Sequence, residues 1–114
     1  GRLDGESHAV TLAKKSASLR IFPDADNKMN RSLIDVGGDA LVVSQFTLYA
    51  DTHKGHRPAF TDAAPHEQAE MLYLKYVDAL KKEGVRTETG LFAANMQVNL
   101  TNDGPVTILL ESAM

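Results

Sequence analysis

The sequence from Pro65 to Gly84 reads PHEQAEMLYLKYVDALKKEG, and it carries the clearest helical signal in the chain. Its apolar residues recur at a spacing of three or four, which places them on one face of a helix. Proline is favoured in the first turn of a helix and glycine just after its end. We therefore predict an amphipathic helix within residues 61–83 that packs on a sheet. Its tyrosines are expected to belong to the core, on an apolar face made of Ala69, Leu72, Tyr73, Tyr76, Val77 and Leu80.

The strongest strand signal precedes this helix, at residues 40–49, which read ALVVSQFTLY. The first half is apolar on both faces, as in a strand at the centre of a sheet. The second half alternates, with Gln45 and Thr47 on one face and Ser44, Phe46 and Leu48 on the other. Polar groups that appear midway along a buried strand need hydrogen-bond partners or a cavity. Two interpretations stay open: side chains bonded to backbone, or a pocket at the end of the strand.

Weaker patterns complete the expected fold. Residues 1–114 are expected to form one domain of the α/β class, α+β in type. It would contain a mixed or antiparallel sheet, or a partial barrel, with one or two packed helices. Asp4 or Ser7 is the expected N-cap of a first helix. The remaining predicted elements are a helix over 7–19, strands over 28–33, 85–89, 95–101 and 106–110, and turns over 23–27 and 35–39.

Composition excludes several chemistries. The chain has 114 residues, a formal net charge of −3 and no cysteine. Disulfides, thiolate metal sites and a cysteine nucleophile are therefore excluded. No apolar run approaches the ~18 residues that suggest a membrane-spanning helix. His53 and His56 are three residues apart but lack a second pair of metal ligands at suitable spacing. We expect no metal and no cofactor.

Positive charge concentrates in one predicted loop of this acidic chain, residues 51–60. Lys54 and Arg57 are the candidates for contacts with nucleic-acid phosphates. A basic loop that only faces solvent and a loop that binds phosphate both fit the pattern, and a metal site fits it least.

The segment Asn102-Asp103-Gly104-Pro105-Val106-Thr107 contains the only Gly-Pro pair. Proline has no backbone donor and a fixed φ, whereas glycine adopts angles closed to other residues. Such a corner can direct its carbonyls outward, where they could recognise an amine or a hydroxyl. The alternative is an ordinary turn, since these residues are also a strong turn signal.

Two separated motifs carry a family resemblance. They are Ser44-Gln45-Phe46-Thr47-Leu48 and the corner segment 102–107, joined by Lys54-Gly55-His56-Arg57-Pro58 and Gly90-Leu91-Phe92-Ala93-Ala94-Asn95-Met96. In this order around a helix, they resemble the D-aminoacyl-tRNA deacylases from about residue 12 to residue 112.

The resemblance implies a cytoplasmic homodimer that serves proofreading in translation. It would hydrolyse the ester between a D-amino acid and the 3′-terminal adenosine of tRNA, and possible substrates include glycyl-tRNA mischarged on tRNA-Ala. The active site would lie at the subunit interface. Members of this family begin with a few dozen more residues, so an N-terminal part of the domain is expected to be absent here.

The resemblance also implies roles for individual residues. Gly104 and Pro105, joined by a cis peptide bond, would form a chiral filter that enters the partner's pocket and excludes L side chains. Ser44, Gln45, Phe46 and Thr47 would form the catalytic segment. Lys54 and Arg57 would contact tRNA phosphates. The substrate-binding residues would be Leu48, Phe92, Ala93, Met96, Asn102, Gly104, Pro105, Val106 and Thr107.

The mechanism implied by the residues is not covalent. Thr47 is the obvious nucleophile, but no base accompanies it in the sequence. We favour water attack assisted by the 2′-hydroxyl of the substrate's own ribose. The resemblance implies that backbone amides of the 44–48 segment stabilise the oxyanion. The competing hypothesis is a module derived from this family that only binds tRNA or only dimerises.

Overall fold

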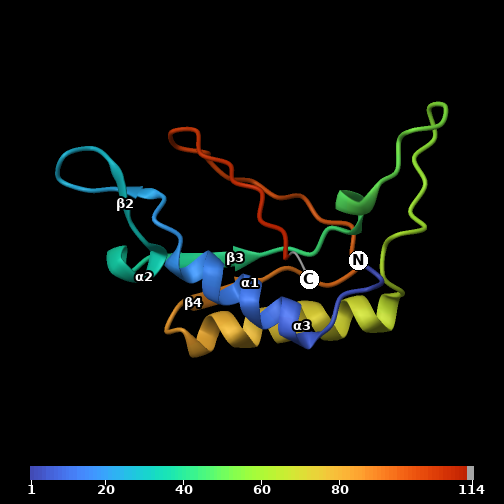
Figure 1. Ribbon diagram of the computed structural model, residues 1–114, viewed down its shortest axis with the longest axis horizontal. Coiled ribbons are helices and arrows are strands. Elements are labelled where there is room, and N and C mark those ends of the chain that lie inside the picture. The colour runs from blue at the N-terminus through green and yellow to red at the C-terminus, as the bar shows by residue number, and fades with distance from the viewer. Residues whose placement is uncertain (113–114) are drawn as a thin grey trace.

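The computed structural model describes residues 1–112 as three helices, one 3₁₀ helix and four short strands (Figure 1). The chain is α/β, and its described strands do not close into a barrel. Long segments without regular structure rise above the helices, and the molecule extends 47 Å along its longest axis. In chain order the elements are α1 (Glu6–Ser18), β1 (Phe22–Pro23), β2 (Met29–Arg31), α2 (Leu33–Val36), β3 (Asp39–Val42), η1 (Phe46–Tyr49), α3 (His66–Lys82) and β4 (Arg86–Thr89).

The core lies where α1 packs against α3 below the β3–β4 sheet (Figure 1). Helix α1 contributes small side chains, and Ala13 and Ala17 are completely buried. Helix α3 contributes Leu80, which is 2% exposed and is the largest fully buried side chain. Burial of these apolar surfaces is the main force that holds the two helices and the sheet together.

Helix α3 confirms the strongest prediction. It begins directly after Pro65, which is its N-cap, and it ends at Lys82. Gly84 follows with a φ of 89°, a left-handed conformation that suits glycine at the end of a helix. Helix α1 also confirms a prediction, but its N-cap is Gly5 rather than Asp4 or Ser7.

The strands form two separate pairs. β3 and β4 are parallel, in a register that runs from Asp39 opposite Arg86 to Val42 opposite Thr89. β1 and β2 form an antiparallel hairpin around the turn that was predicted at 23–27. The predicted strands at 28–33 and 85–89 are thus confirmed in shortened form.

The predicted ten-residue strand at 40–49 is wrong in its second half. β3 ends at Val42, and residues 46–49 form η1 instead. The prediction of a central strand is also wrong, because β3 has a single neighbour among the described residues and Leu41 is 60% exposed. The apolar run therefore predicts that a strand forms, but it does not predict how many strands lie beside it.

The turn predicted at 35–39 begins as the short helix α2. Ser32 is the N-cap: its hydroxyl accepts a hydrogen bond from the Asp35 N–H at 3.1 Å, and the Asp35 carboxylate accepts one from the Ser32 N–H at 2.9 Å. Such reciprocal capping satisfies N–H groups at the start of a helix. The hydrogen bond from the Ser32 N–H to the carboxylate is the main cause that lowers the pKa of Asp35. Gly37 ends the helix with a φ of 64°.

The strands predicted at 95–101 and 106–110 are wrong. These residues form an extended arm, residues 95–110, that runs out to the Gly-Pro corner and back without a described ladder (Figure 1). Alternation of apolar and polar residues favours a strand, but a strand also needs a neighbour to pair with. Within residues 1–112 no helix has the length and apolar character to cross a membrane.

Candidate functional site

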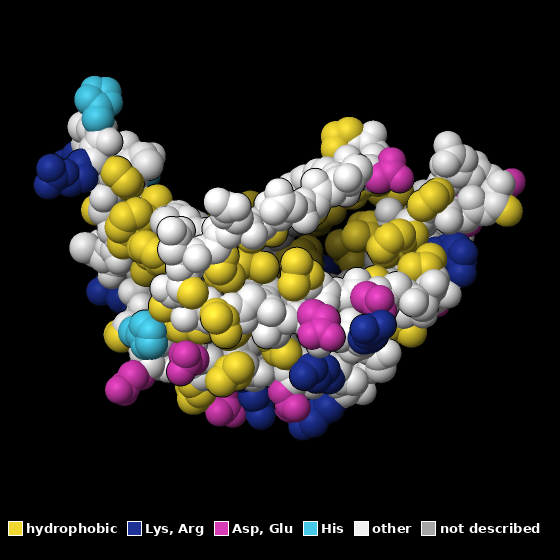
Figure 2. All heavy atoms as spheres, turned by 180° about the vertical axis from the view of Figure 1, so that it is seen from behind, with side chains coloured by type: hydrophobic (Ala, Val, Ile, Leu, Met, Phe, Trp, Pro, Cys, Tyr) yellow, Lys and Arg dark blue, Asp and Glu magenta, His cyan; other side chains and the backbone are white. Residues whose placement is uncertain are grey.

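A cleft of about 740 Å³ opens between α3, η1 and the loop after β4. Figure 2 shows the molecule hollowed between two projecting parts, with hydrophobic side chains gathered in the hollow. The cleft is bounded by two of the sequence motifs and by one end of α3. Its walls include Ser44, Gln45, Phe46, Tyr49, Phe60, His66, Leu72, Tyr73, Phe92, Ala93, Asn95 and Met96.

The first wall is the segment that leaves β3. Ser44 and Gln45 are extended residues that follow Val42 and Val43, and Phe46 opens η1. The Phe46 ring lies edge-on to the Phe60 ring, with centroids 4.9 Å apart. This edge-to-face pair is a favourable aromatic arrangement and fixes the mouth of the cleft.

The second wall is the loop that follows β4. Ala93 has a φ of 62°, a left-handed conformation that turns the chain, and the Ala94 N–H donates to the Leu91 carbonyl at 3.2 Å. Gly90 permits a close approach, because a Cβ placed on it would lie 2.5 Å from Met96 Sδ. The sulfur of Met96 therefore packs directly over the backbone at Gly90, and Met96 forms part of the wall.

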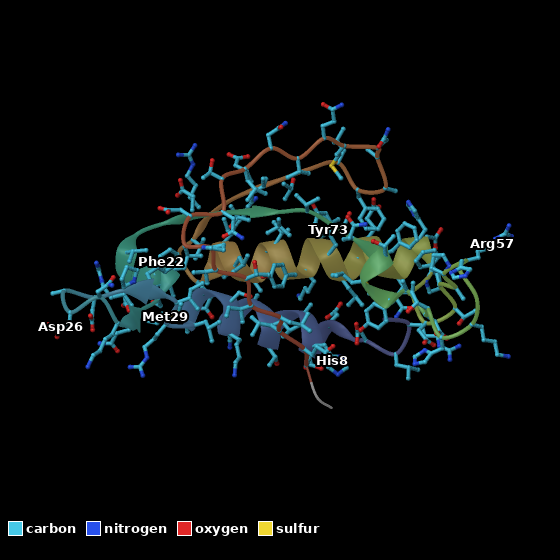
Figure 3. The ribbon with its side chains drawn as sticks, turned by 90° about the horizontal axis from the view of Figure 1, so that it is seen from above. His8, Phe22, Asp26, Met29, Arg57 and Tyr73 are labelled. Carbon is cyan, nitrogen blue, oxygen red and sulfur yellow. The ribbon has the colours of Figure 1, made fainter. Side chains whose placement is uncertain are left out.

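Aromatic side chains from α3 support the second wall. The His66 ring lies edge-on to the Phe92 ring, with centroids 5.0 Å apart. The Tyr73 ring is tilted relative to the Phe92 ring, and the two centroids are 5.6 Å apart. The Tyr73 hydroxyl also donates a hydrogen bond to the Val42 carbonyl at 3.3 Å. Figure 3 shows Tyr73 on α3, in the middle of the molecule.

One ionisable group of the cleft has a shifted pKa. Burial raises the pKa of the Tyr49 phenol, and the negative charges of Asp4, Glu111 and Asp62 raise it further. Tyr49 is therefore a neutral hydroxyl at physiological pH. Among residues 1–112, no three His, Asp or Glu side chains gather closely enough to hold a metal ion.

Two residues of the first motif do not line the cleft. The Thr47 hydroxyl accepts a hydrogen bond from the Gln45 side-chain amide at 2.5 Å. Leu48 is 76% exposed. The threonine is thus engaged with a neighbour in its own motif, and the leucine faces solvent.

The Gly-Pro corner lies at the far end of the 95–110 arm, directed away from η1 (Figure 1). The Gly104–Pro105 peptide bond is cis, as the resemblance implied, and Gly104 has a φ of 136°. Asn102 holds the corner: its side-chain carbonyl accepts from the Val106 N–H at 3.0 Å, and its amide donates to the Thr107 hydroxyl at 3.2 Å. Residues 102–107 take no part in the cleft of their own chain.

The basic loop projects from the opposite end of the molecule. It is closed at its base by an antiparallel bridge between Asp51 and Ala59, and Lys54 and Arg57 are exposed near its tip. Arg57 lies at one extreme of the molecule in Figure 3, well away from Tyr73. Hydrogen bonds from His53 lower the pKa of Asp51. Residues 51–59 of the loop are therefore a separate surface outside the cleft, whereas Phe60 at its end lines the cleft.

Several cleft residues were missed from the sequence. Tyr73 was interpreted as a core residue, because a position on the apolar stripe of a helix favours burial. The structure leaves it half-buried and lining the cleft. His66 and Phe60 belong to no recognisable sequence motif. The one signal in the sequence is their position at the two ends of the loop before α3.

The fold and the cleft define a small α/β protein whose main cleft is built from two sequence motifs and one end of a helix. The sequence matches the family described as D-Tyr-tRNA(Tyr) deacylase over residues 1–111, and the chain belongs to this family. Membership makes the chain a hydrolase. Curated relatives named D-aminoacyl-tRNA deacylase include one from Rhodopirellula baltica, 59% identical over 97% of this chain and 77% of its own length. Another, from Thermotoga petrophila, is 52% identical over 99% of this chain and 76% of its own length.

A solved structure resembles the whole described fold. It is that of c-Myc DNA Unwinding Element Binding Protein, with a TM-score of 0.88 and 40% sequence identity. The similarity covers 98% of this chain and 76% of the solved one.

Proposed function

We propose that this chain hydrolyses the ester bond of D-aminoacyl-tRNA in the cytoplasm, where it releases free D-amino acid and tRNA. Mischarged glycyl-tRNA is a second expected substrate. The observation that carries the proposal is that two distant family motifs, residues 44–46 and 92–96, line one cleft. The curated relatives that match nearly the whole chain are named for this reaction.

The first wall supplies the electrostatics of the proposed reaction. The first N–H groups of a helix have no partner within it. In η1 the cleft residue with such an N–H group is Phe46, the first residue of the helix. Fixed amide dipoles of this kind can stabilise the oxyanion that develops when water attacks an ester carbonyl. The 2′-hydroxyl of the terminal ribose then assists the attacking water, so the protein contributes position and charge stabilisation.

The second wall and a second copy of the chain supply selectivity in this proposal. Phe92, Ala93 and Met96 shape the space for the aminoacyl group. Gly104 and Pro105 of another copy enter that space and exclude L side chains by their backbone carbonyls. The position of the corner on a projecting arm supports a role in another chain's cleft (Figure 1). The proposed active form is therefore a homodimer.

The test is release of tyrosine from D-tyrosyl-tRNA and from L-tyrosyl-tRNA by the purified chain. We expect release from the D-ester and at least about tenfold slower release from the L-ester, because a steric filter rejects the wrong hand. Equal rates on both esters would contradict the chiral filter. Salt-dependent tRNA binding with no hydrolysis would instead favour the non-catalytic module.

Thr47→Ala is expected to leave kcat/KM on D-tyrosyl-tRNA within about threefold of the wild-type value. The Thr47 hydroxyl is engaged by Gln45 and has no base beside it, so it is not positioned as a nucleophile. Thr52→Ala, an exposed threonine in the next loop, is the matched control. Complete loss of activity in Thr47→Ala, with normal activity in Thr52→Ala, would support Thr47 as the nucleophile.

A further inference from the structure

We propose that Tyr73 is a positioning residue that sets the separation of the two cleft walls. Its hydroxyl contacts Val42, two residues before the first motif, and its ring contacts Phe92 in the second motif. This inference rests on the proposed function, because it assigns Tyr73 a role in the same cleft.

The hydroxyl of Tyr73 acts on the first wall. It donates to the carbonyl of Val42, the last residue of β3, at 3.3 Å. The same carbonyl accepts the Gly90 N–H at 3.3 Å. One oxygen atom therefore joins α3, the end of β3 and the start of the loop after β4. Residues 44–46 leave β3 directly beyond this junction, so their direction depends on it.

The ring of Tyr73 acts on the second wall. Its centroid lies 5.6 Å from the centroid of the Phe92 ring. His66, in the first turn of α3, also contacts the Phe92 ring, with centroids 5.0 Å apart. Aromatic pairs at such distances add stability beyond simple burial. Phe92 is thereby held against one rigid helix from two positions seven residues apart, and the loop that carries it takes its position from α3.

The chemistry makes this separation matter. Proposed oxyanion donors on the first wall and the aminoacyl pocket on the second must be held at one distance for productive binding. A helix is a more rigid support than a loop. Tyr73 thus transmits the rigidity of α3 to two segments that have little regular structure of their own.

The hydroxyl is tested by Tyr73→Phe, which keeps the ring. We expect kcat on D-tyrosyl-tRNA to fall about fivefold, the effect of one ordinary hydrogen bond, with KM within about twofold. The matched control is Tyr76→Phe, one turn along the same helix. Its hydroxyl donates to Ser16 Oγ at 2.8 Å, remote from the cleft, so it should lower the melting temperature and leave kcat and KM unchanged.

The ring is tested by Tyr73→Leu. This change removes the aromatic neighbour of Phe92, and we expect KM to rise about fivefold in addition to the loss in kcat. All rates are measured well below the melting temperature of the least stable variant, so that unfolding does not contribute.

The outcomes separate the two proposals. Unchanged kcat and KM in Tyr73→Phe, or equal losses in Tyr73→Phe and Tyr76→Phe, would overturn the positioning role while an active wild type upheld the hydrolase. A wild-type chain without activity on the D-ester would overturn both.

Discussion

D-Tyrosyl-tRNA that ends in 2′-deoxyadenosine is expected to be hydrolysed about 10²–10⁴-fold more slowly than the ordinary substrate, the usual contribution of general acid–base assistance. The cleft is also lined by Asp4 and His66, but the hydrogen bond described for the Thr47 hydroxyl comes from Gln45 and not from either of them. In the proposed mechanism the assisting group is the ribose hydroxyl, so its removal should act on kcat. Single-turnover release of D-tyrosine from the 3′-ester measures the effect.

The control for the deoxy substrate is its binding. An unreactive amide analogue with and without the 2′-hydroxyl should bind with similar affinity, because the hydroxyl assists attack rather than recognition. Hydrolysis of the deoxy ester at the ordinary rate would show that the protein supplies the base, and the search would then return to the side chains of the first wall.

Leu80→Ala is expected to lower the free energy of unfolding by about 2–5 kcal/mol, the range found for large-to-small changes in cores. Leu80 is 2% exposed and packs with Ala13, Ala17 and Val85, so few neighbours have the length to refill the space. Because small domains are stable by only about 5–15 kcal/mol, this is a large fraction of the total. Urea unfolding followed by circular dichroism measures it.

Leu74→Ala on the same helix is the matched control. Leu74 is 55% exposed, so the same change removes little buried surface and should cost less than about 1 kcal/mol. A similar loss in both variants would contradict the core explanation, because alanine has the higher helix propensity and the exposed change removes little buried surface.

The helices could be predicted from the sequence, and the sheet only in part. The apolar period and the flanking Pro65 and Gly84 are local signals, and α3 obeys them. A strand depends on partners far along the chain, which explains why the strands predicted at 43–49, 95–101 and 106–110 are absent. Helix α2 was missed although Ser32, Asp35 and Gly37 form a capping pattern, because four residues are too few to show a period.

The candidate site was predictable where it coincides with a motif. Residues 44–46, Phe92, Ala93 and Met96 were named from the family resemblance, and the structure brings them to one cleft. Tyr73 could not be found in this way, since a tyrosine on an apolar stripe gives the same pattern whether it is buried or lines a cavity. Its role depends on the carbonyl at the end of β3, which no sequence pattern reveals.

The row of alanines along α1 has a consequence for tolerated variation. Ala13 and Ala17 are completely buried against α3, and Ala9 is nearly so. Methyl side chains let two helix backbones approach more closely than leucine would allow. Any larger residue at these positions would wedge the helices apart and tilt α3, on which both cleft walls depend. A saturation library should therefore admit glycine or serine at positions 13 and 17 more readily than valine or leucine, a size limit set by the spacing of the two helix axes.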